Sequence, residues 1–472
     1  MGRSASGAGC PLDRREIAEM RRRRAGTNDR SPRRAAQLAA FACWLSLASV
    51  PTAARARHLT LPEAEVRALA ASPAARVARL EALAAHERSM QAYARHLGEG
   101  DLVASGNRFE GARLVRPITG PITPATMAAM PFDRDQLHFG AAWQIPLFAG
   151  GALVRGDRAA RLAERAADAQ ASHALDEVRY NVRAAYRNVL ATRHALDVSL
   201  AYEQALTQDD VSARLQVETE AWSAADAAKV SFALASARAR RAALTAQLQS
   251  SQALLAAIMG EDGAVTYELE DIPDEPAALP QRSLADLSDA AQTGRRDLAG
   301  ARAAAEAQEE RAGAVRAGFW PQLALAGSYL WNRGRDVGRV PETYEVTLQL
   351  RIPILSDVGR VFAAREADAV AAQAAERARA KELEVRGQVV DALGRLDAAR
   401  AGFDAGKAQR ALGAEVARVE KLKLESGRGK VEDYLAARAQ ALEGETGYWQ
   451  GLYGLQSAYD YLALVTGIGG TP

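Results

Sequence analysis

Apolar and polar residues follow two different periods along this chain, and the two periods succeed each other in a fixed order. Residues 137–145 alternate apolar or aromatic residues with polar or small ones, which is the period of a β-strand with one apolar face. Residues 147–272 contain no proline and are rich in Ala, Arg, Glu and Leu, which favours long helices. The stretch 153–218 alone predicts a helix of about 100 Å, at roughly 1.5 Å per residue, which is longer than a compact domain needs.

The same order of elements occurs twice. Residues 145–260 match residues 352–467 in unbroken register, and the second copy is free of proline from 354 to 471. Matched pairs include Ile145/Ile352, Pro146/Pro353, Val178/Val385, Arg193/Arg400, Glu218/Glu425, Asp226/Asp433, Leu255/Leu462 and Gly260/Gly467. A repeat of this size indicates one supersecondary unit used twice, in one elongated domain.

The duplication predicts two structural repeats behind a leader. The first repeat, 57–283, is expected to hold a helix at 62–97, a β-hairpin at 101–147, a long α-hairpin at 153–259 and a connecting segment at 261–283. The second, 284–472, is expected to hold a helix at 285–317, a β-hairpin at 319–354 and a long α-hairpin at 360–466. Residues 101–136 contain four prolines and little periodicity, so most of them are expected to be loop, followed by a strand about nine residues long. The helix before each β-hairpin and the return helix are expected to stack end to end beside the long helix. Leu435, Leu442 and Trp449 predict a heptad seam on the second return helix.

Residues 1–56 are expected to be a secretory signal peptide. Three arginines precede an apolar run at 35–50, and Ala54-Arg55-Ala56 resembles a cleavage site, with Met20 as a possible true start. This segment holds 11 of the 60 Lys and Arg residues and 4 of the 58 Asp and Glu residues, so the remainder is mildly acidic. It also holds both cysteines, and a lipid anchor on Cys43 is a less favoured alternative to cleavage.

The sequence carries no catalytic signature. The six histidines are scattered without metal-ligand spacing, and no nucleophile elbow, phosphate loop or dinucleotide-binding motif occurs. We therefore expect neither an enzyme nor a bound cofactor or metal. Nucleic-acid binding is disfavoured because the arginines are spread among glutamates along the helices.

The junction motifs and the turn motifs resemble those of one family, the TolC-like outer membrane efflux proteins. The strand-to-helix junction 145–151, with Pro146, Gly150 and Gly151, looks like the family's motif, and Pro353 marks a weaker second copy. The turn 426–433 is similar to the family's helical tip, with a Gly followed six residues later by an Asp, and Gly427 is expected to have a positive φ in this turn. The first tip, 219–226, keeps the Asp but has Glu220 where the family has Gly.

This resemblance implies a mainly α fold with a transmembrane β part. Three chains would form a 12-stranded β-barrel in the outer membrane, continued by an α-helical tunnel in the periplasm, with segment 261–283 in an equatorial belt. A linker exposed to solvent is an equal alternative for that segment. Physical reasoning supports a homotrimer, because four strands cannot close a barrel and open edges in lipid would leave backbone groups without hydrogen bonds.

The resemblance also assigns roles at the tips. It implies a periplasmic gate that includes Asp433, Asp226 and Arg428, with Leu424 where the family has a tyrosine and Gly429 where it has an arginine. Contacts with an adaptor are implied for Gly427, Gly429, Glu220 and Trp222. The alternative for both aspartates is helix capping, since an Asp in the first turn of a helix is favoured there.

The expected function is a passive export duct that works with a periplasmic adaptor and an inner-membrane pump of the RND or ABC type. A channel for type I protein secretion is the alternative within the family. A periplasmic adaptor or a soluble coiled-coil scaffold is less favoured, because neither combines duplicated hairpins with preceding strand pairs. Most of the mass would lie in the periplasm, and the substrate is not expected to be selected by a duct.

Overall fold

The architecture described below comes from a computed structural model, which describes residues 57–118, 121–261, 266–272, 283–354 and 358–468. The expected signal peptide, with Met20 and Cys43, lies outside the described residues. So do parts of the connecting segment 261–283 and of the second strand-to-helix junction.

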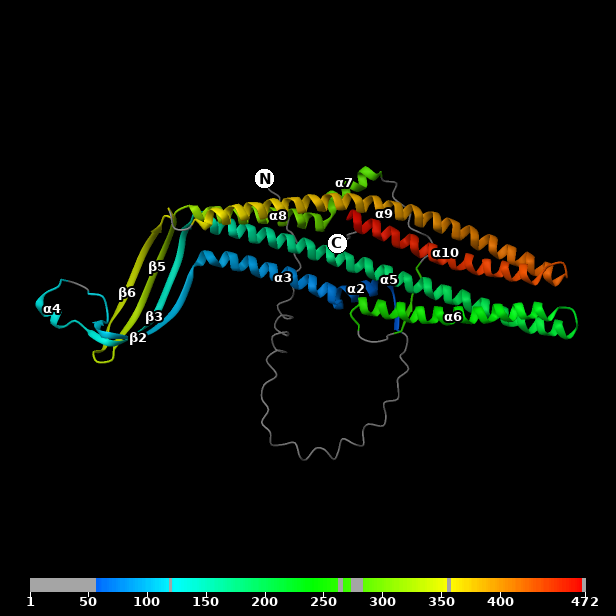
Figure 1. The fold of residues 1–472 in the computed structure, drawn as a ribbon, viewed down its shortest axis with the longest axis horizontal. Coiled ribbons are helices and arrows are strands. Elements are labelled where there is room, and N and C mark those ends of the chain that lie inside the picture. Colours follow the sequence, from blue (N-terminus) through cyan, green and yellow to red (C-terminus); the bar gives the residue numbers. More distant parts are fainter. Residues whose placement is uncertain (1–56, 119–120, 262–265, 273–282, 355–357, 469–472) are drawn as a thin grey trace, which may run out of the picture. The chain divides into compact units, whose positions relative to one another are not determined.

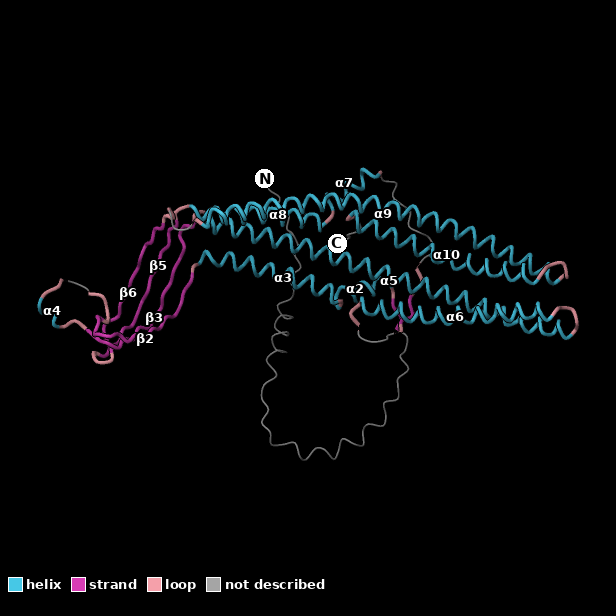
Figure 2. Tube along the Cα trace, in the orientation of Figure 1, coloured by secondary structure: helices cyan, strands magenta, loops and turns pink. Residues whose placement is uncertain are grey.

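Four long strands form one antiparallel sheet in the order β2-β3-β5-β6. They are β2 (Glu99–Leu114), β3 (Phe132–Ala149), β5 (Gln322–Gly334) and β6 (Gly338–Arg351), drawn side by side in Figure 2. The expectation of loop over most of 101–136 was wrong, because β2 occupies residues 99–114 and pairs along β3. Its glycines, at 100, 106 and 111, weaken the apolar alternation, while the strand itself is held by the ladder to β3. The strand expected to be nine residues long has 18.

The sheet has one apolar face and one polar face. Trp143 lies beside Gly327, whose other neighbour in register is Val346, and Phe139 stacks on Trp331 with ring centroids 5.4 Å apart. On β6 the apolar side chains are largely exposed in the single chain: Tyr344 80%, Val346 65%, Leu348 63% and Leu350 62%. The opposite face carries polar side chains, among them Asp101, Gln144, Ser328, Glu345 and Thr347. An exposed apolar face of this extent requires an apolar environment.

Two pairs of very long helices confirm the expected hairpins. The first pair is α5 (Ala152–Glu218) and α6 (Ala224–Ile258), and the second is α9 (Gly359–Glu425) and α10 (Val431–Thr466). Figure 1 shows the two hairpins side by side, with their turns at the end away from the sheet. The return helix α10 also packs against α5 and α6, which joins the two repeats.

The helices before the β-hairpins are each broken once, which the sequence analysis missed. The first is divided into α2 (Leu61–Ala71) and α3 (Pro73–Ala94), and the second into α7 (Leu284–Gly294) and α8 (Arg296–Arg316). Pro73 explains the first break, because the residue before a proline disfavours the helical conformation. Short 3-10 turns follow at Arg95–Leu97 and Ala317–Phe319.

Each return helix ends against the break of its own repeat. Gly260 and Gly467, with φ of 75° and 68°, terminate the two return helices, and a Cβ on either would collide with Ala71 or Gly294. Because α3 and α6 both pack on α5, and α8 and α10 both pack on α9, the expected end-to-end arrangement beside the long helices is confirmed. Small residues at these junctions allow the helix ends to meet.

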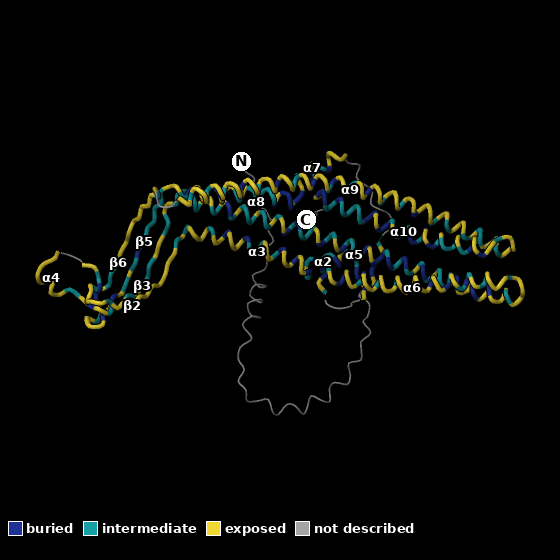
Figure 3. The backbone as a smooth tube through the Cα atoms, in the orientation of Figure 1, coloured by how far each residue is buried: buried dark blue, intermediate teal, exposed yellow. Residues whose placement is uncertain are grey.

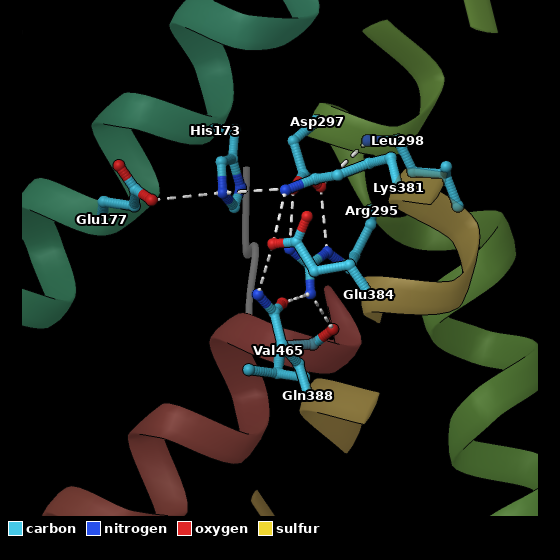
Figure 4. A network of polar contacts seen from close by, with 9 residues as sticks. All are labelled: His173, Glu177, Arg295, Asp297, Leu298, Lys381, Glu384, Gln388 and Val465. Atoms are coloured by element: carbon cyan, nitrogen blue, oxygen red, sulfur yellow. Dashed lines mark hydrogen bonds and ion pairs between the residues drawn. The ribbon is translucent and has the colours of Figure 1, made fainter. Parts of the chain in front are cut away.

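A cluster of charged residues holds the second break (Figure 4). Arg295 and Asp297 are 5% and 4% exposed, and the guanidinium binds the carboxylate through contacts of 2.9 and 2.6 Å. Lys381 Nζ lies 3.2 Å and His173 Nε2 lies 3.6 Å from the same carboxylate. Burial alone would raise the pKa of Asp297, but the hydrogen bonds from Arg295 and the charges of His173, Arg295 and Lys381 hold it well below its usual range.

The main core lies where α5 meets a two-stranded parallel sheet of β1 (Arg57–Leu59) and β4 (Tyr267–Leu269). Tyr186 is fully buried there, and its hydroxyl donates to the carbonyl oxygens of Leu59 (2.9 Å) and Glu270 (2.8 Å). Burial raises the pKa of Tyr186 to about 12. Figure 3 shows the buried positions concentrated along the helices rather than in the sheet.

A short helix, α4 (Pro124–Ala128), lies between β2 and β3. In the part of the chain that the structure describes, none of the helices combines the length and apolar character that crossing a bilayer requires.

Candidate functional site at the helical tips

The two tip turns have the same backbone hydrogen bonds. In the first turn, the N–H of Thr219 donates to the carbonyl oxygen of Leu215, and that of Glu220 donates to Val217. The N–H groups of Ala221 and Trp222 both donate to the carbonyl oxygen of Gln216. In the second turn, the N–H of Ser426 donates to the carbonyl oxygen of Leu422, and that of Gly427 donates to Leu424. The N–H groups of Arg428 and Gly429 both donate to the carbonyl oxygen of Lys423. The sequence repeat therefore extends to individual backbone contacts at the turns.

Both turns place one residue in the left-handed region. Gly427 has φ of 72°, which suits a glycine, and the expectation of positive φ at this position is confirmed. Glu220 has φ of 58° at the equivalent position and is the one non-glycine residue with positive φ among the described residues. The first tip thus keeps the turn geometry of the second with a residue for which the left-handed conformation costs free energy.

Asp226 is bound within its own hairpin, by Ser223 and by Lys229, and Lys229 in turn reaches the second hairpin. Its backbone N–H and carboxylate both bind the hydroxyl of Ser223, and Lys229 Nζ lies 3.1 Å from Asp226 Oδ1 and 2.7 Å from Glu432 Oε1. The hydrogen bonds from Ser223 and then Lys229 lower the pKa of Asp226, and that from Lys229 lowers the pKa of Glu432. Ser223 therefore caps the helix, and the Asp226 carboxylate binds the hydroxyl of Ser223 and pairs with Lys229, instead of with an arginine of the second tip.

The other proposed gate residues are placed differently. Asp433 and Arg428 are exposed, and within the described part of the chain neither side chain makes a hydrogen bond or ion pair. Leu424 and Trp222 pack together in an apolar cluster with Val230 and Val431, which joins the first tip to the second. Gly429 lies against the backbone of α9, where a Cβ would come 2.8 Å from the nitrogen of Leu424.

A polar contact between the hairpins, one that the sequence analysis missed, lies above the turns. Tyr434 Oη on α10 donates to Asp209 Oδ2 on α5 (2.8 Å), and Arg438 Nη1 lies 3.2 Å from the same oxygen. Tyr434 is only 3% exposed, and Arg438 lies over its ring at 5.3 Å. Burial, followed by the hydrogen bond to Asp209, raises the pKa of Tyr434. The repeat offered no signal for it, because Ala227 and Ser231 occupy the equivalent positions in the first copy.

The family model that matches the chain is that of the outer membrane efflux proteins, over residues 287–467. The second repeat is thus similar to an outer membrane efflux protein. The match covers most of the second repeat, from within α7 through the β-hairpin to the end of the α9–α10 hairpin. The matched family is described as one of outer membrane efflux proteins, which is a description of transport.

Solved structures share the fold of this chain. A membrane protein from Pseudomonas aeruginosa is 21% identical with a TM-score of 0.74, over 86% of this chain and 93% of the other. The outer membrane protein VceC from Vibrio cholerae is 17% identical with a TM-score of 0.72, over 86% and 96%. The MtrE outer membrane channel of Neisseria gonorrhoeae, in its open state, is 17% identical with a TM-score of 0.70, over 86% and 88%. No match was found among curated proteins. The expected fold class, with strand pairs and long α-hairpins in duplicate, is confirmed.

The first strand-to-helix junction of the chain depends on glycine. Gly150 has φ of 63°, and a Cβ there would collide with the backbone of Ala317 and the side chain of Trp320. Gly151, with φ of 88°, is the N-cap of α5, while Pro146 lies at an irregularity in the pairing of β3 with β5. Pro353 lies two residues after the end of β6, and residues 355–357 lie outside the described part. Among the described residues, no group of three or more His, Cys, Asp or Glu could hold a metal ion.

Proposed function

We propose that this chain is the outer membrane channel of a tripartite export system, a passive duct that receives substrates from an inner-membrane pump through a periplasmic adaptor. The active form is a homotrimer in which twelve strands close one barrel in the outer membrane. The two α-hairpins of each chain contribute to the periplasmic tunnel below it.

The observation that carries this proposal is the sheet. Its outer strands, β2 and β6, each have one edge without a partner strand among the described residues, and its apolar face is exposed. In lipid, each unpaired backbone N–H or C=O costs several kcal/mol, so an isolated sheet of this kind is unstable. Pairing β6 of one chain with β2 of the next satisfies both edges and places the apolar face towards lipid.

The tips supply the proposed periplasmic contacts. Asp433, repeated by threefold symmetry, would surround the entrance with negative charge, while Arg428 and the turn residues Gly427 and Glu220 are exposed for the adaptor. Trp222 and Leu424 serve a different purpose in this arrangement, since both lie in the apolar cluster between the tips. An RND or ABC pump would provide the energy.

The pairing of β6 with β2 can be tested by disulfide formation. Both native cysteines precede residue 57, so single cysteines at 100–106 of β2 and 344–350 of β6 report on one contact at a time. We expect intermolecular disulfides that join three chains, with the reactive positions following the two-residue period. A soluble periplasmic monomer, or crosslinks that ignore this period, would contradict the proposal. Co-purification with an adaptor and its pump tests the assignment to a tripartite system.

A further inference from the structure

The apolar face of the sheet ends in aromatic rings at the end away from the helices. β3 begins at Phe132 and runs into α5, so the turn between β5 and β6, which is in register with the beginning of β3, lies at that far end. There Trp331 stacks on Phe139 and meets Tyr329 edge to face, with ring centroids 5.0 Å apart in the second pair. Aromatic side chains at the edge of an apolar band are typical of the boundary between hydrocarbon and lipid headgroups.

Two arginines follow these rings on the same face. Arg333 lies two residues beyond Trp331 on β5, opposite Leu137 of β3, and on its other side it is paired directly with Arg339 of β6. Directly opposed residues have Cβ atoms about 4.5–5.5 Å apart, and like charges at that separation destabilise a sheet. Glu342 binds the guanidinium of Arg339, whereas Arg333 makes no hydrogen bond or ion pair with any described residue. The opposed pair therefore favours an anion that both guanidinium groups can bind.

Two more arginines enlarge the basic surface beside this pair. Arg108 of β2 is paired with Asp135 of β3 on the same face, and Arg335 lies in the turn two residues after Arg333. The Asp135 carboxylate is shared, at 3.5 Å from Arg108 Nε and 3.3 Å from Arg335 Nη1. The side chains of the two arginines are 69% and 70% exposed. One carboxylate shared by two arginines leaves a net positive charge, so this end of the apolar face is basic.

The other end of the apolar face, next to the helices, is built differently. It ends on Leu323, which is paired with Leu350, and on Ile352 just beyond β6. Arg351 is exposed there, but it follows Leu350 directly and therefore lies on the polar face. Within the four strands as described, arginines stand on the apolar face only at the end away from the helices. Such an asymmetric face matches a bilayer in which one leaflet carries anionic headgroups.

We propose that Arg333 and Arg339 bind a phosphate group on the headgroup of a glycolipid in the outer leaflet. Arg108 and Arg335 extend the basic surface around that headgroup. This inference rests on the proposed function, because it needs the apolar face in lipid and the helices in the periplasm. Planar guanidinium groups bind phosphate oxygens through paired hydrogen bonds, and a bound phosphate removes the repulsion between the opposed arginines. In a trimer the site occurs three times around the barrel.

The test measures binding of lipid A, a phosphorylated glycolipid, to the delipidated trimer in a neutral detergent by native mass spectrometry. Arg333→Gln and Arg339→Gln each remove one of the opposed charges. We expect each to weaken binding of bisphosphorylated lipid A about tenfold, the change that one charge-assisted hydrogen bond supports. Arg351→Gln is the matched control, because it removes an exposed arginine from the polar face of the same sheet, and it should bind lipid A as the unmodified trimer does.

Two further probes separate a lipid site from a site for free phosphate. Dephosphorylated lipid A should bind equally to the unmodified trimer and to all three variants. Inorganic phosphate at the same concentration as lipid A should leave the lipid bound. Displacement of lipid A by inorganic phosphate at that concentration would show a site for free phosphate and overturn the proposal. Equal binding of bisphosphorylated lipid A by the unmodified trimer, Arg333→Gln and Arg339→Gln, or an equal loss in Arg351→Gln, would overturn it too.

Single-channel recording in bilayers of phosphatidylcholine, without lipid A, tests the proposed function separately. A trimer that conducts in these bilayers but binds lipid A independently of Arg333 and Arg339 refutes the lipid site alone. If the unmodified protein neither forms trimers nor conducts, the proposed function fails, and the lipid site fails with it.

Discussion

The two copies of the repeat share a backbone plan but pack their α-hairpins in different ways. In the second hairpin, four glycines lie where a Cβ would approach the opposing helix to between 2.7 and 3.1 Å: Gly406, Gly413, Gly444 and Gly451. The equivalent positions of the first hairpin hold Ser199, Leu206, Ala237 and Leu244. The second hairpin thus brings its backbones into contact, and the first is separated by side chains. Constant element lengths are compatible with two different helix interfaces.

The two helix breaks show the same contrast. At the first, Pro73 interrupts the helix and Ser72 makes no capping hydrogen bond through its side chain. At the second, a buried arginine and aspartate occupy the break and bind residues of α5 and α9. One break follows from local backbone chemistry, whereas the other depends on tertiary contacts.

The largest effect is expected at the second break. Asp297→Ala leaves Arg295 and Lys381 without their shared carboxylate in a buried site, which typically costs about 3–5 kcal/mol. Ser72→Ala, at the equivalent position of Arg295 in the first repeat, should change stability much less, because it removes no ion pair and no capping hydrogen bond. Thermal melting of the solubilised trimer compares them, and equal melting temperatures would remove the distinction between the breaks.

The same site gives a pH dependence of known sign. The pKa of Asp297 is lowered in the folded chain, so its contribution is fully present above the ordinary value of 3.8 and is lost as the pH falls below it. Melting temperatures of the unmodified protein and of Asp297→Ala should therefore converge in strongly acidic solution. A difference that grows on acidification would show that the charge of Asp297 is not what stabilises the break.

The next largest effect on stability is expected at the four glycines between α9 and α10. Gly444→Ala introduces a Cβ 2.7 Å from the carbonyl oxygen of Gln409, and we expect a loss of about 1–3 kcal/mol from overpacking. Gly454→Ala, on the same helix with no atom within 4 Å of the new Cβ, should stabilise the helix by up to about 1 kcal/mol. Chemical denaturation of the two variants gives the comparison. A similar increase in stability in Gly444→Ala and Gly454→Ala would mean that the helices of the second hairpin separate easily.

A smaller effect is expected at the turns. Glu220→Gly relieves the left-handed conformation and should stabilise the first tip by about 1 kcal/mol, while Gly427→Val should destabilise the second by about 1–3 kcal/mol. No atom lies within 4 Å of a Cβ on Gly427, so its cost is conformational and not steric. Hydrogen exchange at the tips measures both changes. We also expect Gly427→Val to weaken crosslinking to the adaptor, and unchanged crosslinking and export would argue against a role of this turn in coupling.

The smallest effect on stability is expected for Asp433. Asp433→Ala removes an exposed carboxylate that has no partner among the described residues, so the melting temperature should hold while cation selectivity falls in single-channel recordings. Asp226→Ala should lower the melting temperature and leave cation selectivity unchanged, because that carboxylate binds Ser223 and Lys229. If Asp433→Ala lowers the melting temperature of the tips and leaves selectivity unchanged, Asp433 is a capping residue and not part of a gate.

The sequence predicted those features that depend on local chemistry. The long helices follow from proline-free, periodic segments, and positive φ at Gly427 follows from the turn motif. β2 was missed because its stability comes from pairing with β3 and its glycines dilute the strand period. The break at Arg295 has no proline to mark it. The contact of Asp209 with Tyr434 joins residues more than 200 positions apart, so no local pattern could indicate it.

The close helix contact at Gly406, Gly413, Gly444 and Gly451 also has a mechanical consequence. Two helices whose backbones touch at several levels resist bending more than either helix alone, since sliding or splaying would have to break many close contacts at once. We expect α9 and α10 to move as a single stiff lever. A displacement of the second tip would then be transmitted along the hairpin to Gly467 and to the charged residues at the second helix break. Motion at one end of the hairpin would therefore move the other end.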